Sequence, residues 1–465
     1  MQLPATEALA IPDVAREVCR ILDRAGKKGW IVGGCVRDLL MGRAVSDWDI
    51  ATNALPEEVV KIFRHVIPTG LQHGTVTVLL PDALGKRWSF EVTTLRGEGA
   101  YTDGRRPDAV EYVTDIERDL ARRDFTVNAI AIDLETLGLI DPYGGLRDLE
   151  TKQLRAVGRA LDRFSEDGLR ILRGARFAAT LGFDIEAETL EAMPKTLETF
   201  RKVSQERVRD EWLKLMKARK PSRGFDIMRE TGMMGITCPE LLEGYGMEQN
   251  KWHGFDVWRH GMECLDACAG DPILRMGALL HDVGKPRTRA WSDKTSDYTF
   301  YDHEVVGAEI AEPIVSRLRF SNDEKVRICH LVRHHLFHYT DNWSDAAVRR
   351  WIKKVSPERL EDLYALNEAD LRAKGREDPS DDLIPLAKLK SRVEAVLAKG
   401  AALSIRSLKV DGKDLMRDLG MKPGRQIGVV LESLLEAVLE NPELNTREIL
   451  LDRAREILGM SDGQP

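Results

Sequence analysis

Alternating apolar and polar positions in the first third of the chain predict a β-sheet. Short stretches rich in β-branched and aromatic residues are typical of strands, and they lie at residues 29–32, 49–52, 75–79, 88–93 and 129–134. Residues 56–65, with a proline in the first turn, predict a helix between two of these stretches. Strands that interleave with helices predict an α+β head with a small mixed sheet.

After Asp162 a helical period dominates to the end of the chain, with glycines and prolines between the segments. This part is therefore predicted to be all-helical. Eight of the ten histidines lie between Trp252 and Tyr339 and mark a region of their own. We expect a head over residues 1–158, a helical neck and body over 159–245, a histidine-rich region over 246–375 and a helical tail over 383–465, with 376–382 as a linker.

Composition narrows the class of protein. The 465 residues are too many for one core, and at about 100–200 residues per domain two to four domains are expected. No apolar run approaches the ~18 residues of a membrane span, and the first residues lack the basic and apolar segments of a secretory signal. Six scattered cysteines exclude a disulfide scaffold and favour a cytoplasmic location, and no membrane partner is expected.

The net charge of −7, from 69 basic and 76 acidic residues, excludes a generally basic surface. Contact with nucleic acid must therefore come from local basic patches. Residues 201–223 form such a patch, with nine basic and three acidic residues. This patch is either an RNA-backbone contact or a solvated helix surface.

The first candidate site combines two glycines with two aspartates. Gly33 and Gly34 follow a predicted strand, where the missing Cβ lets the backbone approach a phosphate, and Arg37 adds a charged donor. Asp47 and Asp49 alternate on a predicted strand, so both carboxylates share one face and suit Mg²⁺. An isolated pair of this kind is usually a polar turn, but the neighbouring glycines and arginine favour a site.

Two further features bear on this site. Glu91 lies in an otherwise apolar strand and is either a third carboxylate or an outward-facing side chain. Asp167, Arg170, Arg173 and Arg176 recur every three residues, which forms one stripe on a helix. The arginines lack matching acids in the stripe, so they favour an anion such as a triphosphate over a salt-bridged surface helix.

Asp167 and Arg170 have the chemistry to read a base. An aspartate accepts from an exocyclic amine, and an arginine donates to a ring nitrogen. Cytosine and adenine present an amine beside an acceptor nitrogen, whereas guanine and uracil present the reverse pattern. One such pair could therefore accept CTP and ATP and reject GTP and UTP, whose polar groups would stay unpaired.

The motifs around these residues resemble those of class II nucleotidyltransferases, the family of tRNA CCA-adding enzymes and bacterial poly(A) polymerases. The matching segments are 33–50, 122–129 (RRDFTVNA) and 141–149 (DPYGGLRDL), and the Glu-Asp-x-x-Arg element at 166–170 matches the family's protein template. Cys35 stands where a small residue is usual, and Gly168 where proline is frequent. The resemblance implies that Asp47 and Asp49 are catalytic and bind Mg²⁺. It also implies that nucleotide is bound by Gly33, Gly34, Arg37, Arg123, Asp167, Arg170, Arg173 and Arg176.

The histidine-rich region resembles the HD phosphohydrolases, including their adjacent His-Asp pair. The resemblance implies a metal site from His260, His281, Asp282 and Asp370. His303 with His334, or with the neighbouring His335, would complete a dinuclear site, and His334 is the predicted ligand. The clustered ligands suit a transition ion such as Mn, Ni, Co or Fe.

Together the resemblances imply a tRNA nucleotidyltransferase that uses CTP and ATP to add C and A to the tRNA 3′ end. The alternatives are a CC-only enzyme, an A-only enzyme, a poly(A) polymerase, or an HD metal phosphohydrolase with a nucleotide-sensing head. Residues 96–113 are the candidate control of the switch from C to A. The oligomeric state is not predicted.

Overall fold

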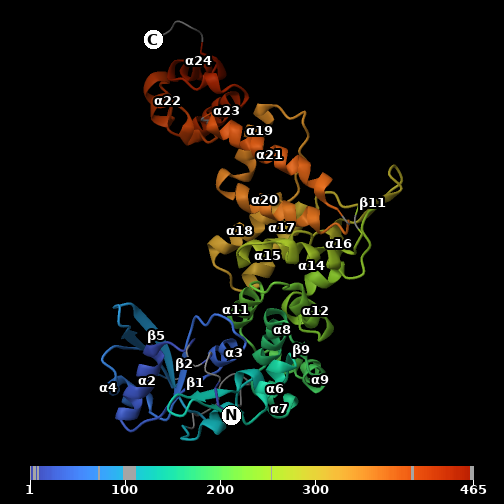
Figure 1. Ribbon diagram of the computed structural model, residues 1–465. Coiled ribbons are helices and arrows are strands. Elements are labelled where there is room, and N and C mark those ends of the chain that lie inside the picture. Colours follow the sequence, from blue (N-terminus) through green and yellow to red (C-terminus); the bar gives the residue numbers. More distant parts are fainter. Residues whose placement is uncertain are drawn as a thin grey trace. The chain divides into compact units, whose positions relative to one another are not determined.

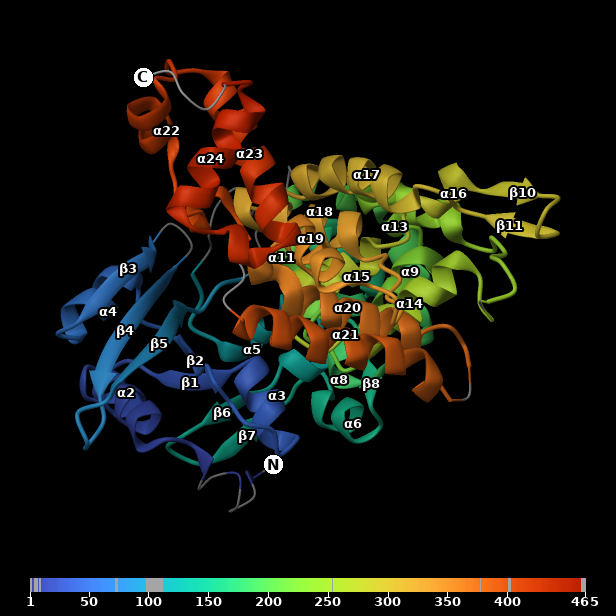
Figure 2. The ribbon, with the colours of Figure 1, turned by 90° about the horizontal axis from the view of Figure 1, so that it is seen from above.

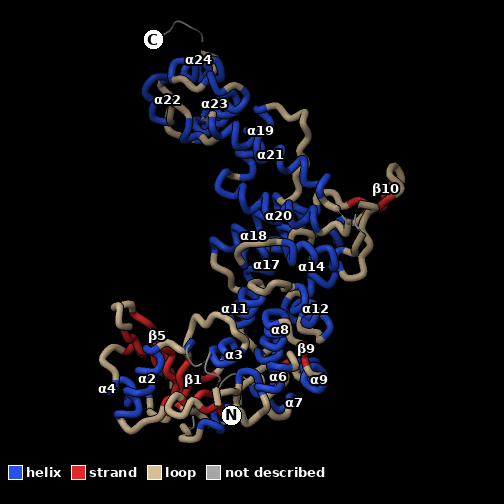
Figure 3. Tube along the Cα trace, in the orientation of Figure 1, coloured by secondary structure: helices blue, strands red, loops and turns tan. Residues whose placement is uncertain are grey.

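The computed structural model describes residues 2–3, 7, 10–71, 74–97, 112–252, 254–376, 378–399 and 403–460. The chain forms two compact units. The first comprises Met1–Leu242 with Arg317–Phe320, and the second comprises Glu243–Ser316 with Ser321–Pro465. Figure 1 labels the elements, and Figure 3 shows that most strands lie near the N-terminus.

A seven-stranded sheet forms the head, in the order β3-β4-β5-β2-β1-β6-β7. Among the neighbouring strands of this sheet, only β2 and β5 run parallel, and the other pairs are antiparallel. The strands are β1 (Gly29–Val32), β2 (Asp49–Thr52), β3 (Val66–Gly70), β4 (Thr75–Pro81), β5 (Arg87–Thr94), β6 (Ala131–Asp133) and β7 (Gly138–Ile140).

The two faces of the sheet have separate apolar cores, because side chains alternate along each strand. Ile31 and Ile50 join the core that contains helices α2 (Asp13–Arg24) and α4 (Pro56–Ile62). Trp30, Val32 and Ala51 join the other core, with α5 (Ile116–Ala121). Three short elements complete the head: α3 (Gly34–Leu40), η2 (Thr126–Asn128) and α6 (Gly145–Glu150).

Helices make up the rest of the first unit. Helix α8 (Leu169–Leu181) packs against α11 (Gln205–Leu215) and α12 (Ser222–Glu230), with a T-shaped contact between Trp212 and Phe225. The other elements are α7 (Ala160–Glu166), α9 (Ala187–Lys195), α10 (Leu197–Phe200), α13 (Met234–Thr237) and η3 (Pro239–Gly244). A short parallel pair, β8 (Gln153–Leu154) and β9 (Asp184–Ile185), joins two of the connections.

The second unit is a helical body followed by a helical tail. The body contains α14 (Val257–Ala267), α15 (Pro272–Leu280), α16 (Lys285–Thr288), α17 (His303–Arg317), α18 (Asn322–His334), α19 (Asp345–Val355), η4 (Pro357–Arg359), α20 (Leu360–Arg372) and α21 (Ser380–Ala398). The tail contains η5 (Ile405–Ser407), α22 (Gly412–Leu419), α23 (Arg425–Glu440), η6 (Pro442–Leu444) and α24 (Arg447–Ile457).

The α+β prediction is confirmed, with two corrections in detail. The region after Asp162 is not entirely helical, because it contains β9 and an antiparallel hairpin of β10 (Ala290–Ser292) and β11 (Asp297–Thr299). The expected linker at 376–382 is shorter than predicted, because α21 already begins at Ser380. Within the described residues, no helix is long and apolar enough to cross a membrane.

All six cysteines carry free thiols, and only Cys329 is partly exposed. Burial raises the pKa of Cys19 and of Cys35 to about 12 and that of Cys268 to about 11. The Cys35 thiol donates a hydrogen bond to the carbonyl of Val32 at 3.1 Å. Cys35 therefore takes the place of a small core residue without becoming reactive.

Candidate active sites

A tight turn between β1 and α3 opens the candidate site of the head. Gly33 has a φ of +81°, and a Cβ there would lie 2.7 Å from Nη1 of Arg123, so only glycine fits. Arg37 on α3 is nearly buried; its Nη1 donates to Oδ1 of Asn128 at 2.6 Å, and its Nε to Oδ1 of Asp38 at 2.9 Å. The turn therefore places two fixed guanidinium groups beside the end of the strand.

Two carboxylates face this turn from the parallel strands β2 and β5, whose register pairs Asp49 with Glu91. Burial and then the charge of Glu91 raise the pKa of Asp49 to about 6. Asp47 precedes β2 and is exposed, with its Oδ2 accepting from the Ser46 hydroxyl at 2.9 Å. The prediction that both aspartates lie on one strand is wrong, because β2 begins at Asp49. Clustered carboxylates that repel one another fit a divalent cation with oxygen ligands.

Each arginine of the α8 stripe has an acidic partner, which corrects the expectation that matching acids are lacking. Arg170 Nη1 lies 2.6 Å from Glu166 Oε2, Arg173 Nε lies 2.7 Å from Asp124 Oδ2, and Arg176 Nε bonds to Glu211. Burial opposes ionisation of Asp124, but the charge of Arg173 outweighs it and lowers the pKa of that carboxyl. Asp124 and Glu211 come from segments distant in sequence, so the fold fixes Arg173 and Arg176 in place, whereas Glu166 lies one helical turn before Arg170.

Asp167 and Arg170 are held by different neighbours. Arg207 on α11 binds Asp167 with both terminal nitrogens, at 3.2 Å to Oδ1 and 2.7 Å to Oδ2. Arg170 is nearly buried, and its terminal nitrogens donate to the carbonyls of Arg163 and Arg122, both at 2.8 Å. The ion pair of Asp167 matches the alternative of a structural salt bridge, and Asp167 and Arg170 line the same cavity.

A cavity of about 580 Å³ collects most of these residues in the first unit. Its lining includes nine cationic and five acidic side chains, so the cavity is positively charged overall and suits a polyanion. Of the predicted residues, it contains Gly33, Gly34, Arg37, Asp49, Glu91, Arg123, Asp167, Arg170, Arg173 and Arg176, but not Asp47.

Sequence reasoning missed several lining residues, among them Arg96, Asp119, Arg122, Asn128 and Phe177. Asp119 is 1% exposed and binds Arg122 at 2.8 Å and Arg123 at 3.2 Å. Its position three and four residues before these arginines is the helical ion-pair spacing, which was a usable signal. Residues 98–111, within the candidate switch segment 96–113, lie outside the described residues.

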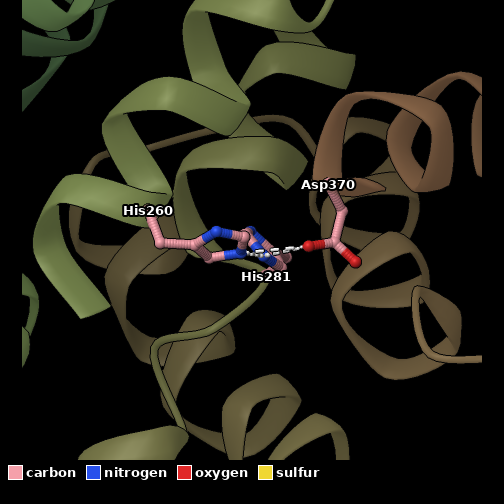
Figure 4. Close-up of side chains that lie close together, drawn as sticks. All are labelled: His260, His281 and Asp370. Carbon is pink, nitrogen blue, oxygen red and sulfur yellow. Dashed lines mark hydrogen bonds and ion pairs between the residues drawn. The ribbon is translucent and has the colours of Figure 1, made fainter. Parts of the chain in front are cut away.

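Six side chains of the second unit form a buried cluster. The residues fall into two groups that could each hold a metal ion: His260, His281 and Asp370 (Figure 4), and Asp282, His303 and His335. His260 Nε2 lies 3.0 Å from Asp370 Oδ1, and His281 Nε2 lies 3.1 Å from Asp282 Oδ2. His303 Nε2 lies 3.4 Å from Asp282 Oδ1, so Asp282 joins the two groups.

The four histidines of this cluster share one arrangement. Each Nδ1 lies within hydrogen-bond distance of a backbone carbonyl, at 3.2 Å for His260, 2.7 Å for His281, 2.7 Å for His303 and 2.8 Å for His335. A carbonyl can only accept, so each Nδ1 carries the hydrogen and each Nε2 of a neutral ring presents a lone pair. The Nε2 atoms meet in pairs at 3.3 Å and 3.2 Å. Such lone pairs repel unless a cation or a proton lies between them, so the donor set fits metal ions.

Burial and the close approach of these groups shift the pKa values of two of the histidines. Burial lowers the pKa of His260, but hydrogen bonds to Asp282 and Asp370 outweigh it and raise that pKa to about 9. Burial lowers the pKa of His335 to about 3. Lys285 Nζ lies 2.6 Å from Asp282 Oδ2 and adds a fixed positive charge at the edge of the cluster.

The structure corrects one predicted ligand. His334 is not in the cluster; its ring lies 4.5 Å from that of His330 and lines a separate surface pocket with it. The neighbouring His335, which ends α18 as its C-cap, enters the cluster instead.

Comparison with known proteins gives one family match in the head, one in the helices that follow the head and one in the second unit. The family models that match are "Poly A polymerase head domain" over residues 29–155, "Probable RNA and SrmB- binding site of polymerase A" over 182–244, and "HD domain" over 264–376. The CCA-adding enzyme of Ligilactobacillus salivarius is 31% identical over 96% of this chain and 98% of the relative. That of Streptococcus pyogenes is 33% identical over 95% and 94%. The chain belongs to the CCA-adding enzyme family.

Solved structures agree with this membership. The crystal structure of the Bacillus stearothermophilus CCA-adding enzyme in complex with CTP is 27% identical, with a TM-score of 0.71 over 99% of this chain and 100% of that one. The Thermotoga maritima CCA-adding enzyme complexed with tRNA shares the fold, with a TM-score of 0.54 and 19% identity over 98% of each chain. The resemblance to nucleotidyltransferases is thereby confirmed. Because the chain belongs to the CCA-adding enzyme family and contains an HD domain, it is implied to depend on divalent metal ions.

Proposed function

We propose that this chain adds C and A to the 3′ end of tRNA from CTP and ATP, without a nucleic-acid template and with release of pyrophosphate. The observation that carries the proposal is the cationic cavity in which Asp49 and Glu91 face the arginines of α3 and α8. Relatives of the same length that are named CCA-adding enzymes support it over a CC-only enzyme, an A-only enzyme or a poly(A) polymerase.

Asp47 and Asp49 are the proposed catalytic residues and would hold Mg²⁺, with Glu91 as a third carboxylate. Burial and then the charge of Glu91 raise the pKa of Asp49, and this supports the assignment, because a divalent cation held by the carboxylates would favour their ionised forms. Bound Mg²⁺ would favour ionisation of the attacking tRNA hydroxyl and offset charge on the leaving oxygen.

Arginines around the cavity have the reach and charge to bind the triphosphate. Arg37 and Arg123 flank the turn at Gly33 and Gly34, where the backbone is open to a phosphate. Arg173 and Arg176 are oriented by Asp124 and Glu211 and keep donors free for a ligand. Held in this way, the triphosphate would present its α-phosphorus to the tRNA hydroxyl.

Asp167 and Arg170 are proposed to read the base. Both line the cavity, and Arg170 is kept in one orientation by two carbonyls. Arg207 holds Asp167 with its acceptor oxygens in place. A base with an amine beside an acceptor nitrogen would pair with both groups, whereas guanine or uracil would leave them unsatisfied.

The tRNA partner is proposed to bind the basic segment 201–223. Several of its cations, among them Lys202, Lys217, Arg219 and Lys220, are exposed, and the segment falls within the RNA-binding family match. The proposed regions 1–158, 159–245 and 246–375 are supported by the ranges of the family matches, and the proposed tail 383–465 is supported by an apolar core of its own. Six free thiols support the proposed cytoplasmic location.

Purified protein incubated with tRNA that lacks its 3′ end, with each nucleotide supplied separately and products resolved by length, tests this function. The parent is expected to add two C residues and then one A. Asp49→Ala should lower incorporation by at least ~100-fold, because it removes a metal ligand from the site and leaves the core intact. Glu135→Ala, which removes an exposed carboxylate of the same head, should retain activity. Near-normal incorporation by Asp49→Ala would refute the assignment.

A second activity is favoured by the buried histidine cluster. We propose that His260, His281, Asp282, His303, His335 and Asp370 hold one or two transition-metal ions (Mn, Ni, Co or Fe) and hydrolyse a phosphomonoester or a 2′,3′-cyclic phosphate at an RNA end. The four Nε2 atoms face one another because each Nδ1 lies at a backbone carbonyl, and a metal ion that displaces the proton of His260 would be bound by them. Metal analysis of the purified protein and assays with both esters test it; neither bound metal nor hydrolysis would mean that this second site is wrong.

A further inference from the structure

A two-stranded hairpin lies, in the chain, between two helices whose first residues belong to the histidine cluster or contact it. β10 and β11 lie between α16, which begins with Lys285, and α17, which begins with His303. The hairpin extends from the helices of the second unit beyond α16 (Figure 2). In the chain, the hairpin therefore lies between Lys285, which contacts the cluster, and His303, which belongs to it.

Aromatic rings cover this hairpin and the segment beside it. Trp291 on β10 is 57% exposed and pairs with Tyr298 on β11 in a T-shaped contact at 5.2 Å. Trp252 is 58% exposed, and its neighbour Lys251 donates its backbone N–H to Asp297 Oδ2 at 3.1 Å, which holds this segment against the first residue of β11. Exposed apolar side chains that lie together, unlike single exposed rings, mark interaction surfaces.

Cations accompany the rings. The Arg289 guanidinium lies 3.6 Å from the centre of the Tyr298 ring, and Lys251 Nζ lies 5.5 Å from that of Trp252. Arg289 Nε is buried and has no hydrogen-bond partner among the described residues. Rings that alternate with cations are the combination that binds single-stranded nucleic acid, because bases stack on the rings and phosphates contact the cations.

The path from these rings to the cluster is short. Phe300 follows β11, and its carbonyl accepts from Nδ1 of His303 at 2.7 Å. Tyr298 is two residues earlier, about 7 Å away at ~3.3 Å of rise per strand residue. On the other side, Lys285 Nζ lies 2.6 Å from Asp282 Oδ2 and 2.7 Å from Gln249 Oε1, three residues before Trp252.

We propose that Trp291, Tyr298 and Trp252 form a stacking platform that holds the last bases of a single-stranded RNA while its terminal phosphate enters the histidine cluster. The proposal rests on the phosphohydrolase function proposed above and narrows its substrate to RNA ends with at least one unpaired base. Bases stack regardless of sequence, so the platform selects single strands over free nucleotides without preference for a base.

Hydrolysis by the full-length protein, loaded with its metal, tests the platform with two substrates. One is a mononucleoside 2′,3′-cyclic phosphate, and the other is a five-residue RNA with the same terminus. The cyclic end has no 3′ hydroxyl, so the head cannot extend it. Trp291→Ala should raise KM for the RNA by about 5- to 150-fold, as stacking is worth ~1–3 kcal/mol per base, and should leave kcat and the mononucleotide kinetics unchanged.

Two variants serve as controls. Trp291→Phe keeps a ring and should retain the parent KM, and Ile384→Ala removes a side chain that is 50% exposed on α21 of the same unit and should change nothing. An equal effect of Trp291→Ala on both substrates, or no effect on either, would refute the platform.

Photo-cross-linking separates failure of the platform from failure of the catalytic proposal. RNA that carries 5-iodouridine next to its terminal residue should cross-link to peptides that contain Trp291, Tyr298 or Trp252. Cross-links there without any hydrolysis by the parent would support the platform and refute the phosphohydrolase function. Hydrolysis without cross-links to the hairpin would refute the platform alone.

Discussion

Asp49 and Glu91 show how one register in a sheet creates a reactive environment. The parallel pairing of β2 and β5 sets the two carboxylates side by side, with Asp49 partly buried and Glu91 exposed, and the burial of Asp49 together with the charge of Glu91 disfavours ionisation of Asp49. The raised pKa of Asp49, about 6, is the result. Asp47 stays exposed outside the strand, so the two aspartates are unequal in surroundings even though the sequence presents them as a pair.

Asp167 offers a test of base reading against a structural role, because Arg207 binds it with two hydrogen bonds. Asp167→Ala should lower discrimination against UTP and GTP by about 10- to 100-fold, the effect of about 1.4 to 2.8 kcal/mol from one hydrogen-bond acceptor. Arg207→Ala removes the same ion pair but keeps the carboxylate, and it should affect selectivity less.

Steady-state incorporation of all four nucleotides measures this selectivity. If both variants lose selectivity equally, the ion pair rather than the carboxylate matters. If neither loses it, Asp167 does not read the base.

Residue identities at the site were predictable where local spacing carries the signal, and not where partners are distant in sequence. Spacing alone placed Arg170, Arg173 and Arg176 on one stripe. Asp124, the partner of Arg173, lies 49 residues before it in the sequence. The choice between His334 and His335 failed for a related reason. Adjacent helical residues point about 100° apart, and only the packing of α18 decides which one faces inward.

Just before helix α8 begins, the backbone at Gly168 lies very close to the backbone of Thr199 and Phe200. A Cβ on Gly168 would lie 2.5 Å from the backbone nitrogen of Phe200 and 2.6 Å from the carbonyl carbon of Thr199. Glycine at position 168 is therefore a packing requirement in this chain. Neither backbone can move without shifting the segment that carries Asp167.

Gly168→Ala should accordingly destabilise the first unit by about 1–3 kcal/mol, as overpacking does. That corresponds to a fall of roughly 2–12 °C in Tm for a unit of this size, and nucleotide addition should fall with it. Gly235→Ala is the matched control in the same unit, since its Cβ would meet only Leu242 Cδ1 at 4.0 Å. Differential scanning calorimetry measures both; an unchanged Tm for Gly168→Ala would contradict the close approach.

Elements were predictable in proportion to their length. Five of the seven strands of the head sheet were predicted, whereas β3 and β7 were not; residues 56–65 were predicted as a helix, but α4 ends at Ile62. The strands β8 to β11 have two or three residues each, too few for a period of two to emerge. Polar residues such as Ser292 and Asp297 within them also resemble turns.

At the scale of the whole chain, the two candidate sites belong to different compact units. His281→Ala combined with Asp282→Ala should therefore abolish the proposed hydrolysis of phosphate esters and the proposed binding of a transition-metal ion. Nucleotide addition with Mg²⁺ should continue at a similar rate. The carboxylates of the head prefer Mg²⁺, whereas the imidazoles prefer a softer ion.

Both activities and the metal content are measured on the same preparation of this double variant. Glu312→Ala, which alters a residue of the second unit at a separate surface pocket, should leave all three unchanged. Loss of nucleotide addition together with a lower Tm would mean that the cluster is structural.

The distribution of the thiols has a practical consequence for spectroscopy. Five cysteines are buried, and burial suppresses the thiolate that reacts with maleimides, whereas Cys329 on α18 is partly exposed. The unmodified chain therefore carries a single preferred attachment point for a fluorophore or a spin label. A probe attached there would report on the second unit without the removal of any native cysteine.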